Sequence, residues 1–172
     1  MERIISEPSI FRSFVFGVED SVVSTVGLVS GIAIVGSARP VILLTGVILV
    51  FVEAFSMAVG DLLSDNAMRE LSAKEERPLH LSFVQALVMF FSYLLSGFFV
   101  LVPYIIFSPS VALPVSIAIS IAILFMLGAY SGKVARVSVW KNGVTMAVIG
   151  GAAILIGMSA GIIIEQFTGS IF

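Results

Sequence analysis

Residues 41–63 read VILLTGVILVFVEAFSMAVGDLL, an apolar run that carries two acidic residues, Glu53 and Asp61. A transmembrane α-helix needs about 20 mainly apolar residues, so this run is long enough to cross a bilayer. An ionisable side chain inside such a helix is energetically costly and is, by default, a sign of function. The stretch therefore predicts a membrane protein with a functional site inside the membrane.

The composition of the whole chain supports the same class. Of its 172 residues, 59% are hydrophobic and only 12% are charged, which excludes an ordinary soluble domain. The absence of cysteine excludes disulfides and thiolate metal sites. We predict an all-α integral membrane protein with a single transmembrane domain over residues 1–172. Its five apolar runs predict five spans, which lie near residues 14–36, 41–63, 82–107, 112–131 and 143–167.

Lysine and arginine are distributed unevenly between the two sides of the predicted bundle. Of the nine, only Arg39 lies on the side of the first and third connections. The other eight lie at the amino terminus and in the second and fourth connections: Arg3, Arg12, Arg69, Lys74, Arg77, Lys133, Arg136 and Lys141. Because cytoplasmic loops are rich in these residues, the amino terminus is predicted to be cytoplasmic. The protein is expected in the cell membrane, or in a vacuolar or other organelle membrane of a eukaryote.

A second acidic pair, Glu19 and Asp20, lies in the first span. At 1.5 Å per residue from the cytoplasmic ends of the spans, Asp20 and Met57 are predicted about 9 Å deep, and Glu53 about 15 Å deep. Asp61 follows Glu53 and Met57 at four-residue spacing, which keeps all three on one side of the helix. Carboxylates suit hard divalent cations, and a thioether shifts the preference toward transition metals. We therefore predict a metal site of Asp20, Glu53, Met57 and Asp61 that favours Fe²⁺ or Mn²⁺.

Each of these residues also has a purely structural interpretation. A buried acid can be protonated or can hold a hydrogen bond at a helix interface, and Met57 can simply fill the core. Asp61 lies near the predicted interface, where it is either a solvated carboxylate or part of an entry funnel. Glu19 points about 100° away from Asp20 around the helix and can pair with Arg12 or face solvent.

Other functions for the whole chain are open from the residues alone. A non-transporting assembly or regulatory subunit could use the buried acids to hold a partner helix, and a transporter could carry another cation. An enzyme is not expected, because the chain has no histidine pair, nucleophile–base set or phosphate-binding loop. We expect no bound cofactor and no nucleic-acid partner. The motifs Gly27-x-x-x-Gly31 and Gly157-x-x-x-Gly161 predict close helix contacts but do not establish a dimer.

Several stretches resemble the vacuolar iron transporter family. Residues 17–31, GVEDSVVSTVGLVSG, are similar to its first helix, and residues 54–60, AFSMAVG, to its second. The polar pair Arg69-Glu70 resembles the exit of that second helix, and residues 142–151, NGVTMAVIGG, are similar to the fifth. The likeness extends over nearly the whole chain.

The resemblance implies a five-helix homodimer that moves Fe²⁺ or Mn²⁺ out of the cytoplasm in exchange for protons. Asp20 and Met57 match the aspartate and methionine of the family's transport site. The chain departs from the family pattern in two places. Residues 64–80 are too short for the Glu-rich cytoplasmic domain that many members carry, and the family glutamate two turns before Met57 is replaced by Leu49, with Glu53 one turn before Met57.

Overall fold

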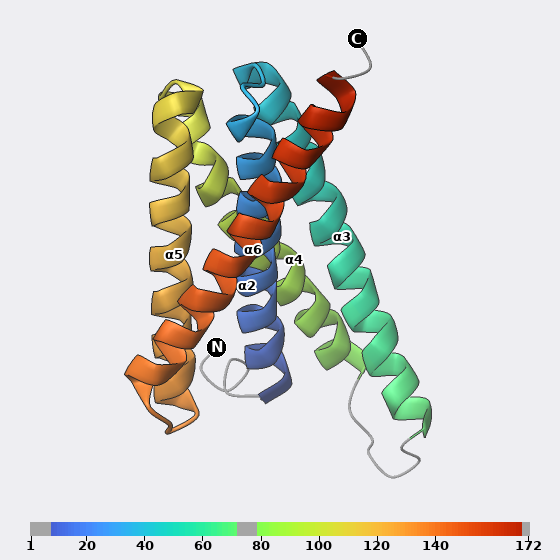
Figure 1. Ribbon diagram of the computed structural model, residues 1–172. Coiled ribbons are helices and arrows are strands. Elements are labelled where there is room, and N and C mark those ends of the chain that lie inside the picture. Colours follow the sequence, from blue (N-terminus) through green and yellow to red (C-terminus); the bar gives the residue numbers. More distant parts are fainter. Residues whose placement is uncertain (1–7, 72–78, 170–172) are drawn as a thin grey trace.

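The structure, a computed structural model, describes residues 8–71 and 79–169. These ranges form five helices and contain no strand (Figure 1). The helices are α2 (Pro8–Ile34), α3 (Arg39–Leu71), α4 (Leu79–Ile106), α5 (Pro109–Val134) and α6 (Val139–Gly169). Each is long and apolar enough to cross a membrane. The predicted all-α fold with five spans is confirmed.

Turn residues set several helix ends where the sequence predicts them. Pro40 lies in the first turn of α3, and Pro109 opens α5 after Ser108, because a proline needs no hydrogen bond at these positions. Gly36, with a φ of +77°, lies in the short turn between α2 and α3. The helices extend beyond most of the predicted ends, and the differences are largest at two places. Helix α2 already begins at Pro8, and residues 64–71, predicted as polar connection, continue α3.

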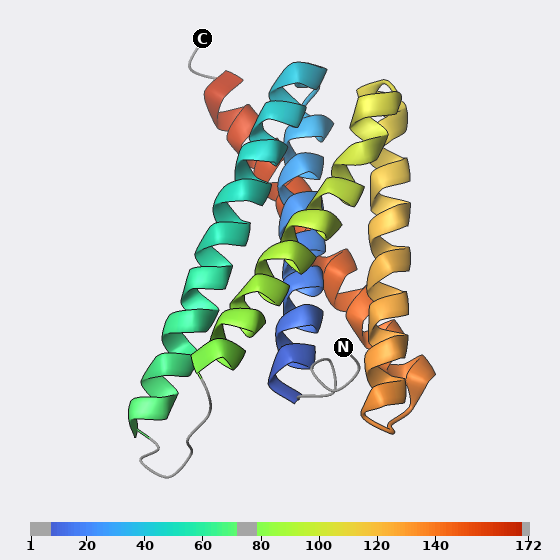
Figure 2. The same cartoon turned by 180° about the vertical axis from the view of Figure 1, so that it is seen from behind.

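Helix α2 is the centre of the bundle and contacts all four other helices. In Figure 1, α6 crosses in front of α2, and in Figure 2 α4 crosses it on the opposite side. Helices α3 and α5 flank α2 to either side. Helices α2, α4 and α6 begin at one end of the bundle, which we call the N-terminal end, and α6 finishes at the opposite end. The acids of α2 therefore lie on the central helix.

The bundle has an apolar exterior and an interior rich in small polar residues. Large apolar side chains such as Phe55, Ile156 and Phe167 are mostly exposed, as expected for surfaces that face lipid. Buried hydroxyls lie inside, including those of Ser13, Ser21, Thr25 and Ser30 on α2, Ser92 and Ser96 on α4, and Ser116 and Ser120 on α5. Small residues let membrane helices approach closely and hydrogen-bond to one another.

The two glycine motifs predicted from the sequence contact each other within one chain. A Cβ atom added to Gly157 would lie 2.1 Å from the carbonyl oxygen of Gly27, and one added to Gly161 would lie 2.1 Å from that of Gly31. Both distances are far below van der Waals contact, so the backbones of α2 and α6 meet here. The motifs therefore form the crossing of α6 over α2 (Figure 1).

The basic side chains that the structure describes follow the predicted asymmetry. Arg12 lies near the start of α2, and Lys133, Arg136 and Lys141 lie around the junction of α5 and α6, all at the N-terminal end. Arg39 lies at the other end, where its Nε atom donates to the carbonyl oxygen of Tyr104 at 2.6 Å. The cytoplasmic position of the N-terminal end stays a prediction from this charge distribution.

Candidate metal site within the bundle

Two acids from different helices approach each other inside the bundle. Asp20 of α2 and Glu53 of α3 are both half-buried, and their carboxylates lie within electrostatic range of each other. They are 33 positions apart in the sequence and meet because α2 and α3 are antiparallel neighbours. This pair is the core of the candidate site.

The register of α2 against α3 explains why Glu53 faces Asp20. Ser13 Oγ donates to Asp61 Oδ2 at 2.8 Å near the N-terminal end, which aligns these two positions. From this contact, Asp20 lies seven residues along α2 and Glu53 lies eight residues back along α3. Farther along, Gly46 packs against Val29, which continues the same alignment. Asp20 and Glu53 therefore lie at nearly the same level.

Met57 lies one helical turn from Glu53, toward the N-terminal end, and is half-buried. Positions four residues apart share a helix face, so its thioether belongs to the same side of α3 as the Glu53 carboxylate. The depth estimate from the sequence, which matched Asp20 with Met57, is wrong by about one turn. That estimate counted each depth from the end of an apolar run, whereas the hydrogen bond between Ser13 and Asp61 sets the register of α2 against α3.

Tyr93 of α4 closes the site from the third helix. Its side chain is 0% exposed, and its hydroxyl lies 2.7 Å from Ser24 Oγ, one turn after Asp20. Its backbone carbonyl accepts a 2.6 Å hydrogen bond from Ser21 Oγ. The hydroxyl is also near enough to Asp20 and Glu53 to interact electrostatically with both. The candidate site therefore has Tyr93 of α4 as a neighbour, in addition to the residues of α2 and α3.

Asp61 lies two turns beyond Glu53 and already has protein partners. Its side chain is buried, with a residue exposure of 8%. One carboxylate oxygen accepts from Ser13 Oγ, and the other accepts from Gln85 Nε2 at 3.1 Å. Arg12 approaches the second oxygen at 4.0 Å from a largely exposed position. Asp61 thus joins α2, α3 and α4, and it is not the solvated carboxylate of the alternative interpretation.

Two further acids, Asp65 and Glu19, lie in this region. Asp65, one turn beyond Asp61, accepts a hydrogen bond from Ser82 of α4. Glu19 is half-buried and interacts electrostatically with Asp20, its neighbour in sequence. Arg12, one of the partners considered for Glu19, lies beside Asp61 instead. Within the described part of the chain, no three residues of the types His, Cys, Asp and Glu are grouped closely enough to hold a metal ion.

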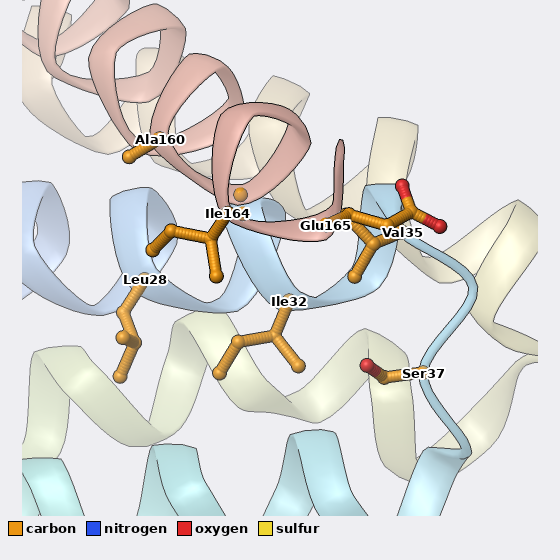
Figure 3. A pocket seen from close by; sticks show the side chains of 10 residues that line it. Leu28, Ile32, Val35, Ser37, Ala160, Ile164 and Glu165 are labelled. Atoms are coloured by element: carbon orange, nitrogen blue, oxygen red, sulfur yellow. The ribbon is translucent and has the colours of Figure 1, made fainter. Parts of the chain in front are cut away.

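An apolar groove of about 570 Å³ lies elsewhere, between α2 and α6 near the end of the bundle opposite the N-terminal end. Its walls include Leu28 and Ile32 of α2 and Ala160 and Ile164 of α6 (Figure 3). Glu165 lies at its margin, with its carboxylate turned away from Leu28 and Ile32 in Figure 3. An aliphatic groove suits apolar chains and not a dehydrated cation. It does not contain the acids of the candidate site.

Three partners in this region carry no charge and are not predicted as site residues from the sequence. Ser13 and Gln85 bind Asp61, and Tyr93 lies beside Asp20 and Glu53. Only Tyr93 has a local signal, because a tyrosine in the middle of an apolar span needs a partner for its hydroxyl. The contacts of the other two depend on how α2, α3 and α4 align.

A protein-family model described as the VIT family matches residues 11–81 and 66–162. The chain belongs to the VIT family. This membership makes it a membrane metal-ion transporter. The two matched stretches overlap at residues 66–81, which include the connection between α3 and α4. A search of curated proteins finds no match to the chain.

Proposed function

We propose that this VIT-family protein exports Fe²⁺ or Mn²⁺ from the cytoplasm and that Asp20, Glu53 and Met57 bind the ion. The observation that carries the proposal is the common level of Asp20 and Glu53 on the neighbouring helices α2 and α3, which follows from the hydrogen bond between Ser13 and Asp61. Two like charges in a poorly solvated site are unfavourable unless a cation or a proton neutralises them. The thioether of Met57, on the Glu53 side of α3, favours a transition metal over Mg²⁺ or Ca²⁺.

The same carboxylates supply a basis for proton exchange. A carboxylate must be deprotonated to bind a metal, so protons and metal ions compete for Asp20 and Glu53. We propose that the ion is released on the far side of the membrane as protons occupy the acids. The protons then leave toward the cytoplasm when the site reopens there. A proton gradient directed into the cytoplasm would therefore drive metal export.

A homodimer would complete the coordination of the ion. Octahedral coordination is typical of Mn²⁺, and Asp20, Glu53 and Met57 supply only three side chains. A second copy, or water, has to provide the other ligands. Large apolar side chains of α3, such as Phe51 and Phe55, are exposed and available for contact with a partner helix in the membrane. We therefore propose that the protein functions as a homodimer.

The test is Mn²⁺ and Fe²⁺ uptake into proteoliposomes that have an acidic interior. Uptake should be faster with the gradient than without it, and the interior should become less acidic as metal enters. Asp20→Asn keeps the size of the side chain but removes a charged ligand, so flux should fall at least about tenfold. Unchanged flux in both Asp20→Asn and Met57→Leu would refute the site.

Two control variants distinguish the loss of a metal ligand from a general effect of substitution on the protein. Glu165→Gln removes an exposed carboxylate outside the site, and Met158→Leu removes a thioether that packs in a separate apolar cluster. Both should transport at the wild-type rate. A competition series with Mg²⁺, Ca²⁺, Co²⁺ and Zn²⁺ tests the metal. Stronger inhibition by Mg²⁺ or Ca²⁺ than by transition metals would argue for a different substrate.

A further inference from the structure

A second apolar groove, of about 600 Å³, lies between α2, α4 and α5 toward the N-terminal end of the bundle. Its walls include Phe11 and Phe14 of α2, Val88 of α4, and Ile123, Met126 and Tyr130 of α5. The ring centroids of Phe11 and Tyr130 are 5.9 Å apart, so the two helices meet here. Met126 and Tyr130 are 61% and 52% exposed, which shows that the groove is open to the outside of the bundle. In a membrane, such an apolar surface contacts lipid chains.

Two exposed cations lie at the end of α5 beside this groove. Lys133 follows Met126 by seven residues, or about two helical turns, so both lie on the same side of α5. Arg136 lies in the turn after α5, where its backbone N–H donates to the carbonyl oxygen of Lys133 at 3.3 Å. Its φ of +56° lies in the left-handed region, where glycine is the usual residue after a helix. The groove therefore has a cationic end.

Among the described residues, no carboxylate balances these two cations. The groove walls contain none, and the sequence has no aspartate or glutamate between Glu76 and Glu165. Glu165 lies near the end of α6, at the opposite end of the bundle. Within residues 8–71 and 79–169, neither Lys133 nor Arg136 forms an ion pair. Both charges are therefore available to an anion from outside the protein.

We propose that this groove binds an anionic phospholipid, with an acyl chain beside Phe14 and Met126 and the phosphate group at Lys133 and Arg136. Lysine and arginine donate charge-assisted hydrogen bonds to phosphate oxygens, and basic pockets between membrane helices suit anionic headgroups. Tyr130 lies between the two parts of the site, as is typical of tyrosine at a membrane interface. The lipid site is separate from Asp20 and Glu53 and does not depend on the proposed transport.

The combination of an apolar groove with a cationic end favours this occupant over others. A free phosphate ion would use the cations but not the groove. A second copy of the chain, packed here about a two-fold axis, would bring its own Lys133 and Arg136 toward this pair, and like charges repel. A zwitterionic phospholipid has the same chains and phosphate, but its ammonium group cancels the negative charge. The net charge of the headgroup is therefore the property to vary.

The experiment places a single tryptophan in the groove and measures its quenching by lipids with brominated chains. The full-length protein contains only Trp140, which packs against Phe125, so Trp140→Phe removes its fluorescence and keeps an aromatic ring. In this background, Met126→Trp reports on the groove. Val148→Trp reports on lipid elsewhere, because Val148 is exposed on α6 at a similar distance from the N-terminal end. Proteoliposomes of phosphatidylcholine contain either brominated phosphatidylglycerol or brominated phosphatidylcholine.

Phosphatidylglycerol should bind at Met126→Trp about 5- to 25-fold more strongly than phosphatidylcholine, because each nearby cation contributes about fivefold. The two lipids should quench Val148→Trp equally. Lys133→Gln combined with Arg136→Gln should remove the preference at Met126→Trp. Lys141→Gln should keep it, because Lys141 lies on α6, which packs against another face of α5. Unchanged thermal unfolding midpoints would show that the variants are folded.

Several results would overturn the proposal. Equal binding of the two lipids at Met126→Trp would refute selection by headgroup charge. An equal preference for phosphatidylglycerol at Val148→Trp would show general attraction to the basic end of the bundle and not a site. A preference that survives the loss of both Lys133 and Arg136 would refute their role. If neither lipid quenches Met126→Trp while both quench Val148→Trp, protein and not lipid covers the groove.

Discussion

Asp61 shows how a single buried carboxylate can join three helices. Its two oxygens accept hydrogen bonds from Ser13 on α2 and Gln85 on α4, while Asp61 itself belongs to α3. A buried carboxylate is stable in such a place only when its oxygens have donors. Because both oxygens are engaged, we propose that Asp61 maintains the alignment of the helices and does not serve as a metal ligand.

Substitution of Asp61 should separate these two roles. Asp61→Ala leaves the buried Gln85 amide without its acceptor and should lower the free energy of unfolding by about 1–3 kcal/mol. Asp61→Asn should cost less, because Ser13 can donate to the carbonyl oxygen of Ser9, 3.2 Å away, and accept from the new amide. Thermal unfolding in detergent measures both effects. A Kd for Mn²⁺ that rises as much as in Asp20→Asn would instead make Asp61 a ligand.

At the residue scale, the sequence predicted the acids but not their neighbours. Asp20 and Glu53 are recognisable because a charge in an apolar span is unusual. That they share a metal site stays a prediction. The position of Tyr93 was not predictable, since it depends on which face of α4 meets α2. An uncharged hydroxyl in an apolar span does not by itself indicate its partner.

Helix α6 depends on glycine for its crossing over α2. The backbones meet at Gly27, Gly31, Gly157 and Gly161, where a Cβ atom on α6 would overlap a carbonyl oxygen of α2. Close backbone approach increases van der Waals contact, which is a main source of helix association in membranes. The crossing therefore fixes α6, of which only a small part is buried, against α2.

Gly157→Ala should destabilise the bundle. Its new methyl group would lie 2.1 Å from the Gly27 carbonyl oxygen and force the helices apart, at a cost of about 1–3 kcal/mol. Gly151→Ala is the control on the same helix, because nothing lies within 4 Å of its Cβ position. The control should be neutral or stabilising, since alanine favours helix. Equal unfolding midpoints for the two variants would contradict the crossing.

At the element scale, hydropathy predicted the number and order of the helices but not all of their ends. The apolar part of a span marks where the membrane is, and a helix can continue beyond it because polar side chains do not interrupt backbone hydrogen bonds. Helix α3 does so past residue 63, and Asp65 on this extension binds Ser82 of α4.

In the whole molecule, the residues of the candidate site and their polar neighbours lie on the central helix α2 and on α3 and α4. Helix α2 contacts every other helix and carries Asp20, α3 adds Glu53 and Met57, and α4 adds Tyr93. Hydropathy predicted five spans, and the distribution of lysine and arginine predicted on which side of the membrane each connection lies. They could not predict that α2 would lie between α4 and α6, because helix order in space depends on packing details such as the glycine crossing. The arrangement of the candidate site and its neighbours follows from that order.

The central claim, that Asp20 and Glu53 bind the transported ion together, is tested most directly by an anomalous-scattering map of crystals soaked in Mn²⁺. The account predicts a peak between the two carboxylates, on the side of Met57 and within coordination distance of at least one oxygen of each. Its occupancy should fall in crystals of Asp20→Asn. A peak at Asp61, or one that excludes both Asp20 and Glu53, would contradict the account.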